Sequence, residues 1–337
     1  MKFVKMHGTG NDYIYVNLFE GCEDSVPATY DASGKLLTVD GTAVDELSIR
    51  ISDRHFGIGS DGLICIAPSK VADARMIMFN ADGSEGLMCG NGIRCVAKFA
   101  FDKGLVKTEA SGSETGWQDD GRFFMTCETA SGIKGLTLTI ENDLCAYVEV
   151  NMGQAILKPA DIPVDAAKMG AANDERVAQS GFAPDEVVIG RKLEVNGHTF
   201  PVTCVSMGNP HCVVFLADPE VEAFFGKGTG VMDLDLEKIG PFFESHEAFP
   251  EKINTEFVEI VDDHTIKMRV WERGSGETMS CGTGTCGATV ASVLNGYVKR
   301  GAEVEVQIRG GSLYDTWLES GEVLMKGPAT SVFTGEY

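Results

Sequence analysis

Two cysteines of this chain stand directly before a Gly-x-Gly turn, and their types and spacing could do proton chemistry. Cys89 begins "CGNGIRC" (89–95) and Cys281 begins "CGTGTCG" (281–287). An apolar pattern at helical spacing follows each turn, so each thiol is predicted at the start of a helix. The unpaired backbone N–H groups and the positive dipole end of a helix N-terminus favour an anion and lower the pKa of a thiol.

Two such thiols acting on one carbon can invert a stereocentre. One sulfur, as thiolate, takes the α-proton of an amino acid, while the other, as thiol, gives a proton to the opposite face. The same helix N–H groups can hold the substrate carboxylate, and the glycines let a ligand approach the backbone closely. Donors aimed at that carboxylate stabilise the developing negative charge in a site closed to water. The scheme needs no cofactor, and the chain has no Walker motif and no evident pyridoxal-phosphate lysine.

The two cysteine turns belong to an internal repeat. The segments "RMIMFNADGSEGLMCGNG" (75–92) and "KMRVWERGSGETMSCGTG" (267–284) share one plan, and Asn80 and Glu272 each lie nine residues before the cysteine. A second pair, "VKMHGTGND" (4–12) and "VSMGNPH" (205–211), stands earlier in each half. The repeat predicts two related halves, 1–145 with Cys89 and 146–327 with Cys281, whose pseudo-twofold arrangement would bring the cysteine turns face to face.

Strand-like runs rich in β-branched and aromatic residues dominate the rest of the chain. We expect strands at 75–80, 136–140, 146–152, 211–216, 256–261, 265–272 and 302–308. Polar stretches at 21–47 and 107–121 are interpreted as surface loops or insertions.

Composition excludes several classes of partner. The 337 residues include 28 basic and 50 acidic side chains, a net charge of −22 that repels nucleic acid and anionic membranes. No apolar run is long enough to span a bilayer, and the first residues lack the features of a signal peptide. We therefore expect a cytoplasmic protein whose ten cysteines are mostly reduced.

Other uses of the cysteines stay open. The pairs 89/95 and 281/286 could bind zinc, but their spacing exceeds the usual knuckle and no histidine cluster accompanies them, so no metal is expected. Cys95 and Cys286 are expected on the inner faces of their helices. A Cys89–Cys281 disulfide would be an oxidised, inactive form. A dinucleotide site is disfavoured because the third glycine and the downstream acid of that fingerprint are absent.

A small set of polar residues could select the substrate. Arg273, beside the second cysteine turn, can clamp a carboxylate or form a surface ion pair. Four asparagines at strand ends or in turns suit an ammonium and carboxylate pair, although each is also a common turn residue: Asn11, Asn80, Asn209 and Asn254. His211 is expected to support the site.

The ordered blocks "KMHGTGNDYIYVN", "FNADGSEGLMCGNGIRC", "VSMGNPHCVVF", "NTEFVEIV" and "VWERGSGETMSCGTGTCGA" resemble the diaminopimelate epimerase family across nearly the whole chain. The resemblance implies an α/β (α+β) fold of two pseudo-symmetric halves. Each half is a strongly curved, mostly antiparallel sheet around a central helix, and the last strand, 328–337, returns to the first half. It also implies a cytoplasmic homodimer without cofactor whose product feeds lysine and peptidoglycan synthesis.

For the site, the resemblance implies Cys89 and Cys281 as the two bases. Backbone donors of Gly90, Asn91, Gly282 and Thr283 would hold the reacting carboxylate. The substrate would also be bound by Asn11, Asn80, Asn209, Asn254, Glu272 and Arg273, several of them at its distal, non-reacting end. One departure is Gly62, where many members have Gln.

Two alternatives remain. The chain could be a racemase of another amino acid, such as histidine, proline or glutamate, with the same chemistry. It could also be a non-catalytic amino-acid-binding protein on the same scaffold. Such a binder is expected to have lost one of the two cysteines, and this chain keeps both.

Overall fold

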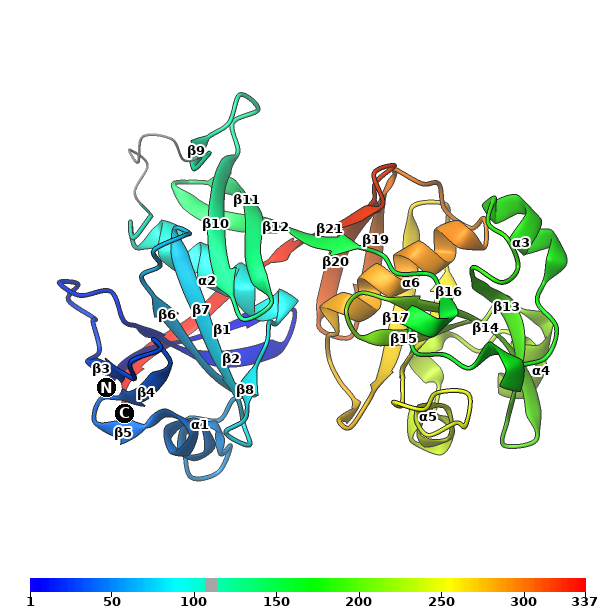
Figure 1. Ribbon diagram of the computed structural model, residues 1–337, viewed down its shortest axis with the longest axis horizontal. Helices are drawn as coiled ribbons and strands as arrows, with labels where there is room; N and C mark the ends of the chain where they lie inside the picture. Colours follow the sequence, from blue (N-terminus) through cyan, green and yellow to red (C-terminus); the bar gives the residue numbers. More distant parts are fainter. Residues whose placement is uncertain (107–113) are drawn as a thin grey trace. The chain divides into compact units, whose positions relative to one another are not determined.

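The computed structural model describes residues 1–106 and 114–337, and in them strands outnumber helices (Figure 1). The chain is therefore a mixed α/β protein. The described residues form six α-helices: α1 (Val44–Ser52), α2 (Gly90–Asp102), α3 (Asp174–Ser180), α4 (Pro219–Phe225), α5 (Leu236–Glu244) and α6 (Gly282–Leu294). Within the described ranges, none of these helices has the length and apolar character to cross a membrane.

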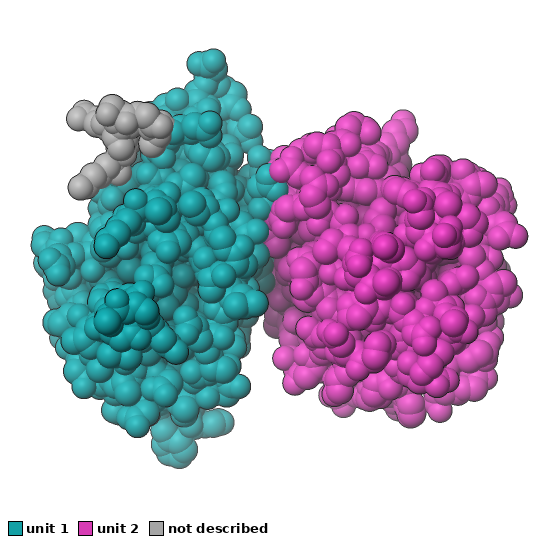
Figure 2. Space-filling view, viewed as in Figure 1, with its two compact units in different colours: residues 1–151, 326–337 teal, residues 152–325 magenta. Residues whose placement is uncertain are grey.

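The chain divides into two compact units, which Figure 2 shows in different colours. Unit 1 comprises Met1–Asn151 and Lys326–Tyr337, and unit 2 comprises Met152–Met325. The C-terminal residues thus belong to the unit that contains the N-terminus, and residue Tyr337 donates its backbone N–H to the Met1 carbonyl at 2.9 Å.

Unit 1 is built on a sheet with the strand order β22-β1-β2-β6-β7-β10-β11-β12. The pairs β2–β6 and β7–β10 are parallel, and the others are antiparallel. Short strands β8 and β9 add to β7 and β10. The bounds are β1 (Lys2–Gly8), β2 (Asn11–Asn17), β6 (Gly62–Ala67), β7 (Ala74–Asn80), β8 (Glu85–Gly86), β9 (Gly116–Trp117), β10 (Phe123–Thr129), β11 (Gly132–Glu141), β12 (Leu144–Gln154) and β22 (Thr330–Glu336).

Unit 2 follows the order β13-β14-β15-β16-β17-β19-β20, and here β15–β16 and β17–β19 are the parallel pairs. β18 adds to β17. The bounds are β13 (Val188–Val195), β14 (His198–Ser206), β15 (Pro210–Phe215), β16 (Asn254–Ile260), β17 (Thr265–Glu272), β18 (Gly276–Glu277), β19 (Glu303–Ile308), β20 (Gly311–Trp317) and β21 (Glu322–Pro328). From β14 to β20, antiparallel and parallel pairs alternate as they do from β1 to β11.

One helix in each unit packs across most of its sheet. α2 contacts β1, β2, β6, β7, β10 and β11, and α6 contacts β14, β15, β16, β17, β19 and β20. Both helices begin immediately after the cysteine of a predicted turn, with Cys89 and Cys281 as extended N-cap residues. The prediction of helices after both cysteine turns is therefore confirmed.

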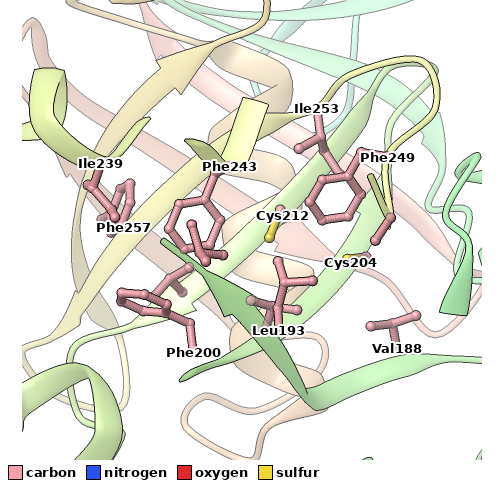
Figure 3. Close-up of a cluster of buried hydrophobic side chains, with 14 of the residues drawn as sticks. Val188, Leu193, Phe200, Cys204, Cys212, Ile239, Phe243, Phe249, Ile253 and Phe257 are labelled. Atoms are coloured by element: carbon pink, nitrogen blue, oxygen red, sulfur yellow. The ribbon is translucent and has the colours of Figure 1, made fainter. Parts of the chain in front are cut away.

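Each sheet sends alternate side chains to a core on the face away from this helix. In unit 1, Ile14 and Val16 of β2 pack with Leu63 and Cys65 of β6 and with α1. In unit 2, rings of Phe200, Phe243 and Phe257 pack edge to face, with Cys204 and Cys212 beside them (Figure 3). Because strand side chains alternate, the residues between these positions face α2 or α6.

The seven predicted strands are present as β7, β11, β12, β15, β16, β17 and β19. The stretch 21–47, interpreted as a surface loop or an insertion, is not an irregular loop: it contains a small antiparallel sheet and the first turn of α1. Its strands are β3 (Ala28–Tyr30), β4 (Leu36–Val39) and β5 (Thr42–Ala43). Five apolar residues within this polar stretch are buried in the unit 1 core and anchor it there: Val26, Leu36, Val39, Val44 and Leu47. Of the second predicted loop, residues 107–113 lie outside the described ranges.

Candidate active site

The Cys89 side chain caps the first turn of α2. Its sulfur accepts a hydrogen bond from the Gly92 backbone N–H at 3.3 Å, and its thiol donates to Asn11 Oδ1 at 3.2 Å. A thiolate at this position would keep the Gly92 donor and gain from the helix dipole. The residue as a whole is half-buried.

The Asn11 amide is oriented by a carboxylate. Its Nδ2 donates to Asp61 Oδ2 at 2.8 Å, and the other Asp61 oxygen accepts from Arg54 at 2.9 Å. With its N–H group held by Asp61, Asn11 presents its oxygen to the Cys89 thiol.

Two further groups bear on the ionisation of Cys89. The Tyr13 side chain interacts with the Cys89 thiol. Arg94, whose side chain is fully buried, donates to Asn91 Oδ1 at 2.9 Å and to the Gly90 carbonyl at 3.2 Å. Burial raises the pKa of the Cys89 thiol above its ordinary value. The Gly92 and Asn91 N–H groups, the Arg94 charge and the Tyr13 hydrogen bond act in the opposite direction.

Cys281 has acidic neighbours instead. Its thiol interacts with the carboxylate of Glu272, which accepts a hydrogen bond from the Thr278 hydroxyl. Thr283 Oγ1 lies 3.5 Å from the Cys281 sulfur. Burial, followed by the charges of Glu272 and Glu256, raises the pKa of Cys281 well above its ordinary value. These surroundings keep the proton on Cys281 more firmly than on Cys89.

Beneath the first turn of α6 lies a buried ion-pairing chain. His211 Nδ1 and Glu256 Oε1 are 2.7 Å apart, and both side chains are completely buried. The other ring nitrogen, Nε2, lies 3.1 Å from Asn209 Oδ1. His211 therefore links the buried carboxylate to the half-buried Asn209 amide.

Asn254 and Arg273 are joined to each other. Asn254 is buried, accepts from the Arg273 backbone N–H at 2.9 Å and donates to the Pro210 carbonyl at 2.8 Å. Both polar ends of this side chain thus hold backbone turns together. The Arg273 guanidinium is exposed and donates to the Glu251 carbonyl at 3.0 Å.

The predicted residues gather in two clusters, one in each unit. In unit 1, Cys89 meets Asn11 and the first α2 turn with Gly90 and Asn91, whereas the Asn80 amide hydrogen-bonds Ser84 at 2.9 Å. In unit 2, Cys281 meets Glu272 and the first α6 turn with Gly282 and Thr283. Asn209, His211, Asn254 and Arg273 form the adjoining network.

Among the polar residues of these clusters that were not predicted are Tyr13, Arg94 and Glu256. A signal for two of them was present, because Tyr13 lies two residues after Asn11, and Glu256 two residues after Asn254. Residues two apart on a strand share a face, so each points to the same helix as its predicted neighbour. Chemically, each cluster offers one thiol at a helix N-terminus, and helix N–H groups next to it can bind a carboxylate.

Comparison with known proteins identifies the family. The sequence profile of diaminopimelate epimerase matches residues 3–158 and 203–332. A diaminopimelate epimerase of Agathobacter rectalis is 47% identical over 338 residues, covering 100% of this chain and 99% of that protein. The chain belongs to the diaminopimelate epimerase family. The diaminopimelate epimerase of Methanococcus maripaludis (strain C6) is 44% identical over 337 residues, with 100% and 99% covered. Family membership makes the chain an isomerase.

Solved structures of more distant proteins share the fold. A hydroxyproline epimerase from Agrobacterium vitis superposes with a TM-score of 0.59 at 13% identity, covering 100% of this chain and 90% of that one. A probable proline racemase from Agrobacterium radiobacter gives 0.58 at 14% identity, with 100% and 92% covered. At 13% and 14% identity, these two comparisons show a shared fold and nothing more.

Proposed function

We propose that the chain converts LL-2,6-diaminopimelate to meso-diaminopimelate without a cofactor, with Cys89 and Cys281 as the two bases. One observation carries the proposal. In a chain of this family, each unit has a central helix whose N-cap residue is a cysteine, and polar side chains beside each cysteine shift the pKa of its thiol. The enzyme class and substrate follow from the family, and the residue roles are our proposal.

The proposed reaction needs two proton transfers at one carbon. A thiolate takes the α-proton, so that the C–H bond breaks and an S–H bond forms, and the opposite thiol gives its proton to the other face. Backbone N–H groups of Gly90 and Asn91, and of Gly282 and Thr283, bind the carboxylate and stabilise the charge that develops on it. The net change is inversion, with one thiol and one thiolate exchanged between the two cysteines.

We assign binding of the substrate, for several of them at its distal amino-acid end, to Asn11, Asn80, Asn209, Asn254, Glu272 and Arg273. The exposed Arg273 guanidinium supports this most directly, because it can bind a carboxylate bidentately. Asn11 and Asn254 already use their amides within the protein, so their contribution would be to position neighbouring groups.

We also infer that units 1 and 2 are pseudo-symmetric halves, each a curved sheet around a central helix. The matching alternation of antiparallel and parallel pairs from β1 to β11 and from β14 to β20 supports this, together with the sequence repeat. We assign one catalytic cysteine to each half.

The setting of the reaction is part of the proposal. The product would supply lysine and peptidoglycan synthesis in the cytoplasm, where thiols stay reduced. We propose a homodimer that associates through β22, because this strand pairs with β1 and presents Val332 and Phe333 at 52% and 47% exposure. Exposed apolar side chains on such a strand favour association.

The test is incubation with LL-diaminopimelate in heavy water, with the configuration and isotope read at each α-carbon. We expect meso product carrying deuterium at the inverted carbon. Cys89→Ala and Cys281→Ala should each lower turnover by about a hundredfold or more, because each removes one proton-transfer group. Cys22→Ser, which changes a half-buried cysteine outside both clusters, should leave turnover unchanged.

Histidine, proline and glutamate, assayed in the same way, separate this function from that of another racemase. Faster exchange with any of them than with diaminopimelate would overturn the substrate assignment. Substrate binding without any exchange would identify a binding protein instead.

A further inference from the structure

We propose that Tyr13 is a catalytic residue, whose phenol hydroxyl donates a hydrogen bond to the Cys89 thiolate and keeps its own proton throughout the reaction. The inference rests on the proposed function in one respect, since it takes Cys89 as a base. It adds a residue that interacts directly with the reacting sulfur.

Strand β2 places Tyr13 on the face that meets α2. Ile14 and Val16 pack in the core on the other face, so Asn11, Tyr13 and Tyr15 share the α2 face. The three contact successive points of the helix start. Asn11 Oδ1 lies 3.2 Å from the Cys89 sulfur, and the Tyr15 hydroxyl donates to the Gly92 carbonyl at 3.3 Å. Tyr13 stands between these two residues on the strand, which places its side chain at the same helix turn, where it interacts with Cys89.

The Tyr13 ring is fixed by its packing. The residue is only 5% exposed, and the ring lies against Gly62. A Cβ at position 62 would come within 3.0 Å of ring carbon Cε1 and 2.1 Å of the Phe79 carbonyl oxygen, so only glycine leaves this space to the tyrosine. This packing restrains the ring and with it the direction of its hydroxyl.

Which neighbours of Cys89 can donate a hydrogen bond, and which can only accept one, gives the Tyr13 hydroxyl its role. The Cys89 thiol donates to Asn11 Oδ1, and Asp61 holds the Asn11 N–H group, so Asn11 serves the protonated sulfur. Once Cys89 is ionised, Asn11 offers it only an oxygen. The Gly92 and Asn91 backbone N–H groups and the Tyr13 O–H then remain as donors, with the Arg94 charge nearby. Tyr13 is the side chain that can favour the thiolate by a direct hydrogen bond.

The tyrosine does not itself ionise. Burial raises the pKa of Tyr13 far above its ordinary value, and the neighbouring Cys89 and Asp61 raise it further. In the proposed step the C–H bond of the substrate breaks and the S–H bond of Cys89 forms. The Tyr13 O–H bond stays intact and only its hydrogen bond weakens as the sulfur is neutralised.

Tyr13→Phe removes this hydroxyl and keeps the ring. We would measure the rate at which iodoacetamide alkylates Cys89 as a function of pH, with the Cys89 peptide quantified by mass spectrometry. The midpoint is the pH at which Cys89 is alkylated at half its maximal rate. Loss of a hydrogen bond to a charged sulfur should raise this midpoint by about one pH unit. Below that midpoint, the isotope exchange rate should fall by about tenfold and recover as the pH rises.

Tyr15→Phe is the matched control, because it removes a hydroxyl from the same strand face that bonds Gly92 rather than the Cys89 sulfur. Its alkylation midpoint should stay where it is in the unchanged protein. Equal midpoints in all three proteins, or the same shift in both variants, would refute the proposal.

Replacing Tyr13 by 3-fluorotyrosine covers the case in which Tyr13→Phe does not fold. Its more acidic phenol is a stronger donor, so the Cys89 midpoint should move down, opposite to the shift in Tyr13→Phe. An unchanged or raised midpoint would again refute the role. Alkylation needs no substrate, so it tests Tyr13 even if the diaminopimelate assignment fails, which the exchange assay tests separately.

Discussion

The two cysteines that cap the central helices have opposite electrostatic neighbours. Cys89 faces donors and the buried Arg94, whereas Cys281 has the carboxylates of Glu272 and Glu256 as neighbours. Burial raises the pKa of both thiols, but acidic neighbours raise it further only at Cys281. In the absence of substrate, ionisation is therefore easier at Cys89.

Arg273 is the residue on which substrate choice depends most in this account. Its backbone N–H holds Asn254 and is untouched by a change of side chain, so Arg273→Ala should fold normally. We expect loss of diaminopimelate turnover through a KM raised by about tenfold or more, because a carboxylate loses a charged partner. Steady-state kinetics with LL-diaminopimelate measure this.

Lys252→Met is a suitable control for Arg273→Ala. Lys252 pairs with Glu244 at 3.0 Å, and Glu244 also accepts from the Gly274 N–H in the same turn, so a cation is lost nearby without loss of the proposed clamp. Unchanged kcat and KM in Arg273→Ala would remove this residue from the substrate site.

Residue types at the site were predictable where a motif carried them, and side-chain partners were not. The cysteine turns, Glu272 and Arg273 stand in recognisable sequence. The use of both ends of Asn254 on backbone groups depends on β16 lying beside β15, with His211 opposite Asn254. Such a contact between distant segments leaves no local pattern in the sequence.

At the scale of the elements, the first turns of α2 and α6 carry the chemistry, and they tolerate added volume differently. A Cβ at Gly92 would meet the flexible ends of Ile64 at 2.7 Å and Met76 at 3.1 Å. A Cβ at Gly284 would meet Glu256 Oε1 at 2.8 Å and the Cys281 sulfur at 3.2 Å. The second site cannot relax without moving the buried His211–Glu256 pair.

Gly284→Ala should therefore lower kcat/KM by on the order of tenfold to a hundredfold, because a small displacement of catalytic groups is costly. Gly92→Ala, the same change in the other helix, should lower kcat/KM by less than about threefold, because the added methyl group meets flexible side-chain ends. Both substitutions gain about 1 kcal/mol of helix propensity, so this gain does not distinguish them. Parallel kinetics and thermal unfolding of the two variants decide this. Equal losses of activity would mean that the Glu256 contact is unimportant.

Elements with a strong period were predictable, and elements built from sparse apolar residues were not. The seven predicted strands carry runs of Val, Ile, Thr and aromatic residues. By contrast, β3, β4 and the start of α1 depend on single buried residues such as Leu36 and Leu47 within a polar stretch. Their burial against β6 and β7 comes from tertiary packing, which composition does not report.

At the scale of the whole molecule, the repeat in the sequence corresponds to one order of strand pairings used twice. Each unit on its own supplies one thiol at a helix start, and one thiol cannot both remove and return a proton on opposite faces of a carbon. The proposed function therefore needs both units, and it requires that Cys89 and Cys281 reach the same α-carbon.

Mild oxidation followed by peptide mass spectrometry tests this requirement most directly. If both sulfurs serve one carbon, oxidation should form a Cys89–Cys281 disulfide, epimerase activity should disappear in step with it, and a reductant should restore both. Full activity in protein whose Cys89 and Cys281 are shown to be bonded to each other would contradict the two-thiol mechanism.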